Sequence, residues 1–284
     1  MSVVVMTRNR WSDLERSMVH HDAPVVVVDN GSTDGTPEQL ARRFPHAEVV
    51  RLDRNLGAAA RNLGVERSAS PYVAFADDDS WWEPGALGRA AELLDAHPHV
   101  AVLAARMLVG APGTLEPLCE VLARSPLGTH GDEPGPRVLG FIACGAVVRR
   151  SAFLEAGGFD EVVFFAGEEE RLALDLAAAG WVLCYAPDVV ARHLPSEHRG
   201  IRRRHVRVAR NAVLTAVMRR PWGQVLRVAV RVSRQPYGVA GLAASLPRLR
   251  MAVRARRPLP APVEAMVRAL QEQPPDPGRP ARVG

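Results

Sequence analysis

The chain has 284 residues, 47% of them hydrophobic, with 36 basic and 31 acidic residues, an ordinary globular composition that allows one large domain with a modest extension. Its three widely spaced cysteines exclude a disulfide framework and a cysteine-based metal site. No apolar run reaches the roughly 18 residues that cross a bilayer, and strand-like residues begin at Val3, which leaves no room for a signal peptide. We therefore expect a cytoplasmic protein.

Short apolar runs alternate with helix-like segments over the first hundred residues. Such alternation predicts βαβ units, and therefore an α/β fold with a mostly parallel central sheet flanked by helices. Because ligands bind beyond the carboxyl ends of such strands, we expect Asp29 and Asp77 on one edge of the sheet. The strands are expected at residues 3–6, 25–29, 48–52, 71–76 and 100–104, and the helices at residues 11–20, 36–43, 57–67 and 84–96.

Two of these strands end in polar motifs. The strand at 25–29 ends in Asp29 and is followed by Asn-Gly-Ser-Thr-Asp-Gly-Thr, which predicts either an ordinary turn or a nucleotide pocket in which Asp29 accepts a hydrogen bond. The strand at 71–76 runs into three carboxylates, at 77–79. Adjacent negative charges repel, so a buried triplet needs positive charge, which a divalent cation with a phosphorylated ligand would supply. A solvated acidic loop is the alternative.

The second hundred residues are less regular. Residues 110–137 are rich in Pro and Gly and predict a mobile loop. A strand is expected over residues 138–148, a helix starting near Gly167, and another strand over residues 182–186.

Together these motifs resemble family 2 glycosyltransferases of the bacterial rhamnosyltransferase and galactofuranosyltransferase type. The resemblance covers about residues 1–220 and implies the GT-A fold and inverting transfer of a sugar from a nucleotide-sugar donor. The motifs that carry it, in chain order, are Thr7-Arg8-Asn9-Arg10, the segment from Val28 to Thr36, Asn55-Leu56-Gly57 with Arg61-Asn62, Asp77-Asp78-Asp79, Gly157 to Glu161, Phe164 to Glu170, His193 to Ser196 with Arg199, and Arg210-Asn211.

The resemblance also implies roles for individual residues. Thr7, Asp29 and Arg61 would bind the base and ribose of the donor. Asp77 and Asp79 match the outer carboxylates of the Asp-x-Asp motif and would hold the metal. Asp78 is a secondary contact to the nucleotide-sugar.

The catalytic base would come from the acidic start of the helix near Gly167. Glu169 matches the position of the base, although the family usually has Asp there, and Glu168 is its main competitor. Acidic residues in a first turn also favour a helix without any catalytic role.

For three further residues, the sequence leaves two possible roles open. His193 is either structural or a third ligand for Mn²⁺ or Mg²⁺, and an imidazole suits Mn²⁺ better. Trp81 and Trp82 either belong to the core or lie on the acceptor side, stacked on a sugar face.

Charge is divided unevenly along the chain. Residues 1–198 contain 17 arginines against 28 acidic residues, whereas residues 199–257 contain 16 arginines and no acidic residue. No nucleic-acid-binding motif is present. In residues 220–234, Arg220, Gln224 and Arg227 fall on one helical face and Trp222 and Leu226 on the opposite one, which is typical of an interfacial helix on an anionic membrane. Packing against the catalytic domain is the alternative.

We therefore expect a GT-A domain over residues 1–199, with a nucleotide-sugar half at 1–105 and an acceptor half at 138–199. A basic helical extension would follow over residues 200–271, and a disordered tail over 272–284. The expected enzyme transfers sugar to a glycan or lipid-linked acceptor at the inner face of the membrane. A nucleotidyltransferase and an inactive scaffold of the same fold are the alternatives.

Overall fold

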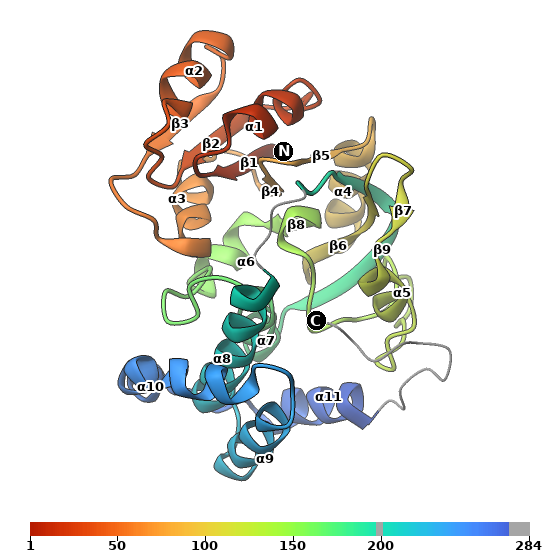
Figure 1. Ribbon diagram of the computed structural model, residues 1–284. Coiled ribbons are helices and arrows are strands. Elements are labelled where there is room, and N and C mark those ends of the chain that lie inside the picture. Colours follow the sequence, from red (N-terminus) through yellow and green to blue (C-terminus); the bar gives the residue numbers. More distant parts are fainter. Residues whose placement is uncertain (197–200, 273–284) are drawn as a thin grey trace.

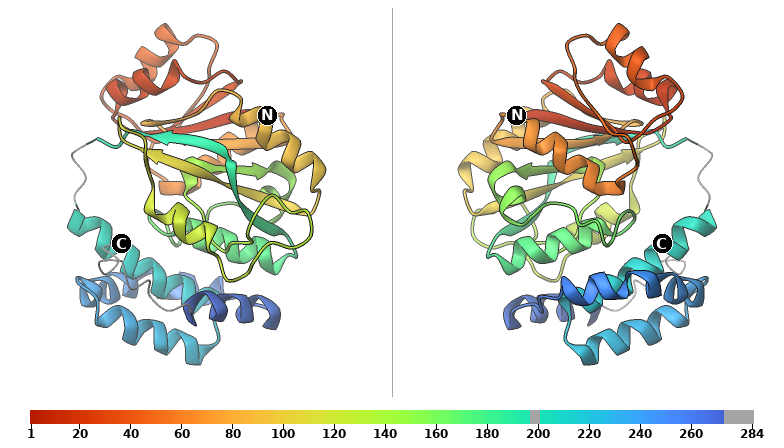
Figure 2. Two further views of the ribbon diagram at one scale, coloured as in Figure 1. Left: turned by 90° about the vertical axis from the view of Figure 1, so that its right-hand side faces the viewer. Right: turned by 90° about the vertical axis from the view of Figure 1, so that its left-hand side faces the viewer.

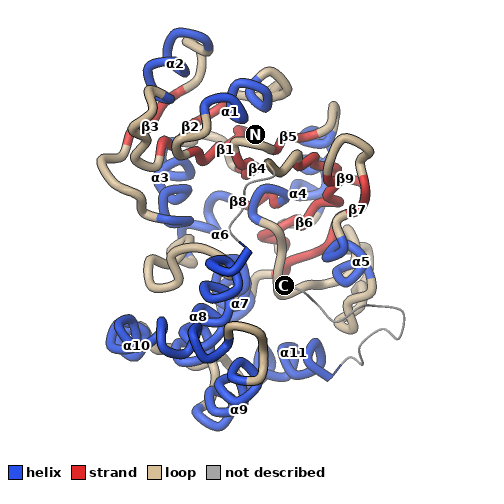
Figure 3. The backbone as a smooth tube through the Cα atoms, in the orientation of Figure 1, coloured by secondary structure: helices blue, strands red, loops and turns tan. Residues whose placement is uncertain are grey.

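The computed structural model describes residues 1–196 and 201–272, and its centre is a nine-stranded mixed sheet (Figures 1 and 3). The strand order is β3-β2-β1-β4-β8-β6-β9-β5, with β7 paired to β6. The strands are β1 (Ser2–Thr7), β2 (Val25–Asp29), β3 (Glu48–Arg51), β4 (Tyr72–Asp77), β5 (Ser80–Trp82), β6 (Val100–Val109), β7 (Thr114–Leu115), β8 (Ala146–Arg149) and β9 (Val182–His193). Arg199 and residues 273–284 of the predicted tail lie outside the described residues.

Helices cover both faces of this sheet (Figure 2). Those before residue 200 are α1 (Trp11–Met18), α2 (Thr36–Arg43), the short η1 (Gly57–Ala59), α3 (Ala60–Arg67), α4 (Ala86–Ala96), α5 (Pro117–Ala123), the short η2 (Ala143–Gly145), α6 (Arg150–Glu155) and α7 (Glu168–Ala178). The four expected helices of the first hundred residues are all present, with small shifts at their ends.

The valine-rich strands β1 and β2 form the centre of the N-terminal half. Their apolar residues are buried, as expected of strands covered on both faces. β1 runs parallel to both β2 and β4, with Thr7 opposite Asp29 and Met6 opposite Asp77. This register confirms that Asp29 and Asp77 lie on one edge of the sheet. The other half is mixed, because β8 runs antiparallel to both β4 and β6.

Strand β9 is longer than expected. The Ala186-Pro187-Asp188 segment predicts a turn, but the strand continues past it through a register shift against β6 and ends at His193. A bulge lets a strand absorb such residues without ending. The extra length pairs β9 with β5 and places His193 opposite Ser80, beside the acidic triplet.

The segment at 110–137 includes short regular elements, where the sequence predicted a loop; the mobility of this segment stays a prediction. It contains β7 and α5, and Cys119 of α5 is fully buried. Its end is held by Arg137, which binds Glu133 and pairs as an isolated bridge with Cys184. The predicted strand at 138–148 is also wrong in part, because only Ala146–Arg149 forms a strand.

Four helices form a layer at one end of the molecule (Figure 2). They are α8 (Ile201–Arg219), α9 (Trp222–Ser233), α10 (Gly238–Arg254) and α11 (Ala261–Glu272). Two apolar clusters join this layer to the rest of the protein. In one, Val162 and Val163 pack on Leu214 and Met218, and in the other Leu174 packs against α11. The extension therefore packs on the α/β domain, which was the alternative to membrane contact.

No helix within residues 1–196 and 201–272 is long and apolar enough to cross a membrane.

Candidate active site

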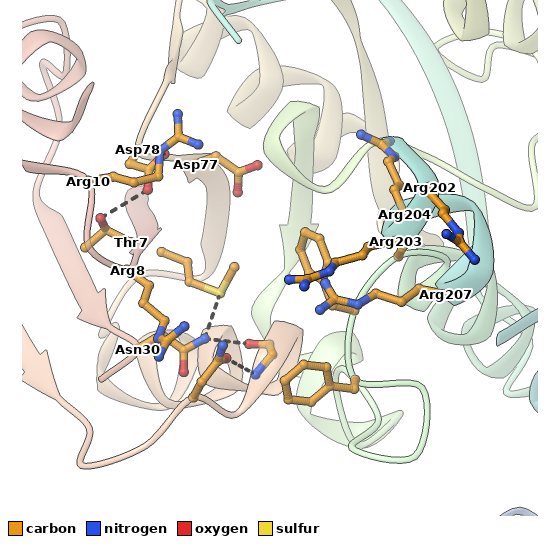
Figure 4. Close-up of a pocket in the computed structure, with 16 residues that line it drawn as sticks. Thr7, Arg8, Arg10, Asn30, Asp77, Asp78, Arg202, Arg203, Arg204 and Arg207 are labelled. Atoms are coloured by element: carbon orange, nitrogen blue, oxygen red, sulfur yellow. Dashed lines mark hydrogen bonds and ion pairs between the residues drawn. The ribbon is translucent and has the colours of Figure 1, made fainter. Parts of the chain in front are cut away.

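A cavity of about 820 Å³ opens beside the carboxyl ends of β1 and β4 (Figure 4). Thr7, Arg10, Asp77 and Asp78 line one side, and the first two turns of α8 line the other. The segment Phe164–Ala166 lies between them. Cavities of roughly 300–1,000 Å³ hold small molecules and cofactors, so the space suits a ligand of nucleotide size.

The acidic triplet forms the turn between β4 and β5. Asp77 and Asp78 face the cavity, whereas the Asp79 side chain is fully buried behind them. Ser80 fixes the turn, because its hydroxyl accepts a hydrogen bond of 2.8 Å from the Asp77 backbone N–H. Burial raises the pKa of Asp78 to about 8, an effect that Arg10 opposes and that the neighbouring Asp77 and Asp79 strengthen.

Protein side chains supply positive charge to all three carboxylates. Arg10 contacts Asp78 at 3.0 Å and Asp79 at 3.1 Å, and Arg61 forms an ion pair with Asp77. The His193 Nε2 atom lies 3.2 Å from Asp79 Oδ1. The triplet therefore does not by itself require an external cation, which corrects the charge argument made from the sequence.

Arg61 has a buried side chain that does not line the cavity. Its side chain is 1% exposed and lies beneath the cavity rather than lining it. It pairs with Asp77, and its Nη1 atom lies 3.9 Å from Glu168 Oε1. Its contact with the base or ribose of the donor stays a prediction. Arg61 instead joins the acidic triplet to the start of α7.

Thr7 and Asp29 flank the cavity at the ends of β1 and β2. The Thr7 hydroxyl donates a 3.1 Å hydrogen bond to Asp78 Oδ2. Asp29 Oδ2 accepts a hydrogen bond from the Ser32 backbone N–H, while Asp29 Oδ1 is buried without a hydrogen-bond partner among the described residues. Buried polar atoms are normally paired, so Asp29 keeps an acceptor for a ligand even though it does not line the cavity itself.

Asn30 is a cavity residue that the sequence did not single out. Its amide donates to the Gly57 carbonyl at 3.0 Å and accepts from the Leu56 N–H at 2.7 Å. It thereby fixes the loop before α3 against the end of β2. Its position directly after a strand-end Asp was the only signal in the sequence.

The three acidic residues Glu168–Glu170 begin α7, directly after Gly167 in the left-handed conformation. Glu168 is buried, and its Oε2 atom has no hydrogen-bond partner in the described part of the chain. Burial, with a smaller contribution from Glu169, raises the pKa of Glu168 to about 8 despite the opposing charge of Arg61. The raised pKa disfavours the ionised form of Glu168, which is the form that accepts a proton.

Glu169 is half-buried, and its Oε1 atom accepts a 3.4 Å hydrogen bond from the Ala143 backbone N–H of η2. Its pKa is raised, chiefly by burial, while this N–H and Arg61 act in the opposite direction. Compared with Glu168, it is more open to solvent and has no direct arginine contact among the described residues. Of the two predicted bases, Glu169 is the more accessible to solvent, and neither lines the described cavity.

The turn before α7 has a strained backbone. Phe164 and Ala166 both have positive φ angles, of 71° and 72°, which is uncommon for residues other than glycine. Asn211 of α8 holds this turn, because its buried amide donates hydrogen bonds of 2.8 and 2.6 Å to the Phe165 and Ala166 carbonyls. The extension therefore helps to set the position of the acidic residues in α7.

Gly57 makes room for the same turn. The Phe164 carbonyl accepts a 2.6 Å hydrogen bond from the Ala58 N–H, and a Cβ atom at Gly57 would lie 2.2 Å from that carbonyl oxygen. The small residues at 57–60 thus leave room for the backbone of the turn at Phe164.

The side chains around Asp79 include donor groups for a divalent cation. Asp79 and His193 lie side by side, and carboxylate with imidazole is a common donor set for Mn²⁺. Asp77, the third predicted ligand, is engaged by Arg61. Within the described residues no three His, Cys, Asp or Glu side chains form a ready metal cluster. The donor chemistry fits a cation, and the third ligand would have to be shared with Arg61.

The two tryptophans after the triplet lie in different surroundings, and the acceptor role of Trp81 and Trp82, one of their two predicted alternatives, stays a prediction. Trp82 is 3% exposed and belongs to the main hydrophobic core. Trp81 stacks on His20, with ring centroids 4.6 Å apart, next to the end of α1. Neither lines the described cavity. The alternation of side chains along β5 explains the split, since neighbouring residues face opposite sides of a sheet.

Comparisons with known proteins agree with this arrangement. The family model of glycosyl transferase family 2 matches residues 2–157. An N-acetylglucosaminyl-diphospho-decaprenol L-rhamnosyltransferase from Mycobacterium tuberculosis is 27% identical over 232 residues, which cover 68% of this chain and 75% of that protein.

Two solved structures share the fold. A mannosyltransferase from Pyrobaculum calidifontis, in complex with GDP-Man and Mn²⁺, has a TM-score of 0.58 and 22% identity, covering 97% of this chain and 76% of its own. GalNAc-T7 with UDP, GalNAc and Mn²⁺ has a TM-score of 0.61 and 16% identity, covering 96% and 56%.

Proposed function

The chain belongs to glycosyl transferase family 2 and has the GT-A fold, and from this premise we propose that it transfers a sugar, with inversion, from a nucleoside-diphosphate sugar to a hydroxyl group. One observation carries the proposal. Arg61 contacts both Asp77 of the acidic triplet and Glu168 at the start of α7. The two acidic groups, 91 residues apart in the sequence, are therefore joined through one arginine, with Asp77 lining the cavity and Glu168 two residues after the lining segment Phe164–Ala166.

Donor binding is assigned to the side of the cavity at the strand ends. Thr7 and Asp78 lie on this wall, and Asp29 has an unsatisfied acceptor next to it. Asp77, Asp79 and His193 would hold Mn²⁺ or Mg²⁺. When bound, such an ion neutralises charge on the diphosphate as the nucleoside diphosphate leaves. The Mn²⁺ in the two structural relatives supports this assignment.

Glu169 is assigned as the base. It would take the proton of the acceptor hydroxyl as that oxygen attacks the anomeric carbon and the bond to the diphosphate breaks. A single displacement of this kind inverts the anomeric configuration. The buried Glu168, whose pKa is raised by burial, would position Arg61 rather than accept a proton.

The test of this function is release of nucleoside diphosphate. We expect the wild-type chain, with Mn²⁺ or Mg²⁺, to hydrolyse at least one of a panel of UDP-, GDP- and dTDP-sugars slowly when no acceptor is present. Chromatography of the nucleotides measures it. Release of pyrophosphate from nucleoside triphosphates would instead identify a nucleotidyltransferase, and neither reaction would occur with an inactive scaffold.

The acceptor is proposed to be a lipid-linked or polysaccharide glycan. The rhamnosyltransferase relative is named for a diphospho-decaprenol acceptor, and residues 199–257 carry 16 arginines without an acidic residue. We propose that residues 1–199 form the catalytic unit and residues 200–271 the extension. The protein would work in the cytoplasm, at the inner face of an anionic membrane.

The extension presents an apolar surface that supports membrane contact. On α9, Trp222, Leu226 and Val230 lie at helical spacing and are 58%, 67% and 43% exposed. On α10, Val239 and Leu246 are 68% and 64% exposed. On α9, Val225 and Val232 pack inward, away from this exposed face. Arg220 is also buried, with its Nε atom 2.7 Å from Glu264.

We expect Leu226→Glu with Leu246→Glu to weaken binding to vesicles of anionic phospholipid by at least about tenfold, because carboxylates repel the surface and remove buried apolar area. Vesicle co-sedimentation measures the change. Val19→Glu is the control, since Val19 is 67% exposed and follows α1, which lies at the end of the molecule opposite the extension (Figure 1). Unchanged binding of the double variant, or an equal loss in the control, would refute membrane contact through this face.

A further inference from the structure

The first two turns of α8 form a second charged wall of the cavity. Four of its arginines line the space opposite Asp77 and Asp78: Arg202, Arg203, Arg204 and Arg207. Figure 4 shows Arg203 and Arg207 extending from α8 into the space between this helix and the strand ends. All four are exposed to solvent.

These four guanidinium groups have no negative partner among the residues that the structure describes. Among the described residues none forms an ion pair, and Arg202 only lies over the Tyr237 ring, 5.8 Å from its centroid. Other arginines of the extension are fixed by acceptors. Arg219 binds Asp175, and Arg220 binds Glu264. The cluster at 202–207 therefore serves no packing role that the described contacts reveal.

Like charges crowd this end of α8. The pKa of Arg210, one turn further on, is lowered to about 10 by burial and then by the charges of Arg248 and Arg207. An anion in the cavity would relieve this repulsion. Guanidinium groups bind phosphate oxygens in pairs, and several together suit a diphosphate.

The position of the cluster argues for the acceptor rather than the donor. The proposed donor diphosphate lies at the other wall, beside the carboxylates of the triplet and their cation. The arginines instead begin the helix that leads directly into α9 and α10, whose exposed apolar side chains form the proposed membrane face. A diphosphate that anchors a glycan to a membrane lipid lies at the membrane surface, where this wall would meet it.

We propose that Arg202, Arg203, Arg204 and Arg207 bind the diphosphate of a lipid-diphosphate-linked acceptor, across the cavity from the donor. This inference rests on the proposed glycosyltransferase function and gives it a substrate class. The acceptor's hydroxyl would then reach Glu169 from the α8 side, while its lipid continues toward the extension.

The test compares two double variants of the full chain by calorimetry. Arg203→Gln with Arg207→Gln removes two charges from the cavity wall. Arg227→Gln with Arg234→Gln removes two exposed charges from α9 and its C-terminal cap, outside the cavity, and is the matched control. The probes are geranyl diphosphate, inorganic pyrophosphate, and UDP, GDP and dTDP with Mn²⁺. Melting temperatures verify that both variants fold.

We expect the cavity variant to bind geranyl diphosphate at least about tenfold more weakly, because two charge-assisted contacts are lost. Its affinity for the nucleoside diphosphate that the wild-type chain binds should stay within about twofold, and the control should match wild type in both.

Several outcomes would overturn the inference. They are a wild-type chain that does not bind geranyl diphosphate, an equal loss in the control, and a parallel loss of nucleoside diphosphate affinity, which would assign the arginines to the donor. Pyrophosphate binding that equals geranyl diphosphate binding in every variant would also overturn it, by showing a site for free phosphate alone. If the wild-type chain bound no nucleoside diphosphate, the proposed function itself would fall first.

Discussion

Glu169→Gln is expected to lower sugar transfer by about 10²- to 10⁴-fold, the usual contribution of a general base. The amide keeps the size of the side chain and leaves Oε1 as an acceptor for the Ala143 N–H, but it cannot take a proton. Donor affinity should remain unchanged, since the side chain is assigned to the acceptor hydroxyl. Steady-state transfer rates, together with calorimetry of the nucleoside diphosphate, measure both effects.

Two matched variants separate this role from general damage to α7. Glu170→Gln changes the next, exposed residue and should retain full activity. Glu168→Gln mimics the protonated form that a pKa of about 8 favours at pH 7, so it should retain most turnover. An inactive Glu168→Gln beside an active Glu169→Gln would transfer the base role to Glu168.

The same assignment predicts the pH dependence. A base acts in its ionised form, so turnover is lost as the pH falls through the pKa of Glu169. Because burial raises this pKa, the acidic limb of the pH–rate profile should lie above the ordinary range near 4.3. In Glu169→Gln this limb should disappear from the residual rate.

Asp79→Asn is expected to weaken Mn²⁺-dependent nucleotide binding by at least about tenfold, because it removes an anionic ligand from the proposed cation site. Calorimetric titration of UDP, GDP or dTDP, with and without Mn²⁺, measures the change. The asparagine keeps the shape of the side chain, which matters because Asp79 is buried against Arg10 and His193. Loss of a buried charge partner can cost about 3–5 kcal/mol, so the melting temperature is needed as well.

Asp13→Asn is the control for this variant. Asp13 binds the same Arg10 Nη2 atom at 2.7 Å, but it lies outside the cavity and the triplet. The Asp13→Asn variant should lose part of the ion pairing of Arg10, and its nucleotide binding should still depend on Mn²⁺. Metal-dependent binding that survives in Asp79→Asn would refute the metal assignment, and an equal loss in Asp13→Asn would attribute the effect to Arg10.

The charge partners of the acidic triplet, among them Arg10 and Arg61, could not be identified from the sequence. The triplet at 77–79 predicted a positive partner, and the structure supplies two arginines and His193. These partners lie 69, 16 and 114 residues away in the sequence from the carboxylates they contact. A pattern of neighbouring residues carries no information on such pairings, so the ion pair between Arg61 and Asp77 could not be predicted from it.

Local patterns were more reliable where a single strand or helix decided the outcome. Valine runs predicted β1 and β2, and the polar residues after them predicted the binding edge. The same patterns missed the continuation of β9 past Pro187, because a bulge depends on the neighbouring strand β6. They also left Trp81 and Trp82 open, because burial depends on what packs above β5.

The sequence by itself determined the family, the α/β fold and the acidic triplet at a strand end, because these depend on local periodicity and on motifs in a fixed order. Only the tertiary structure decided which charges meet. It placed Arg61 between Asp77 and Glu168, brought His193 to Asp79, and set the arginines of α8 across the cavity from the triplet. The physical reason is that charge pairing and burial depend on distances in space, which the folded chain fixes only when all its elements have packed.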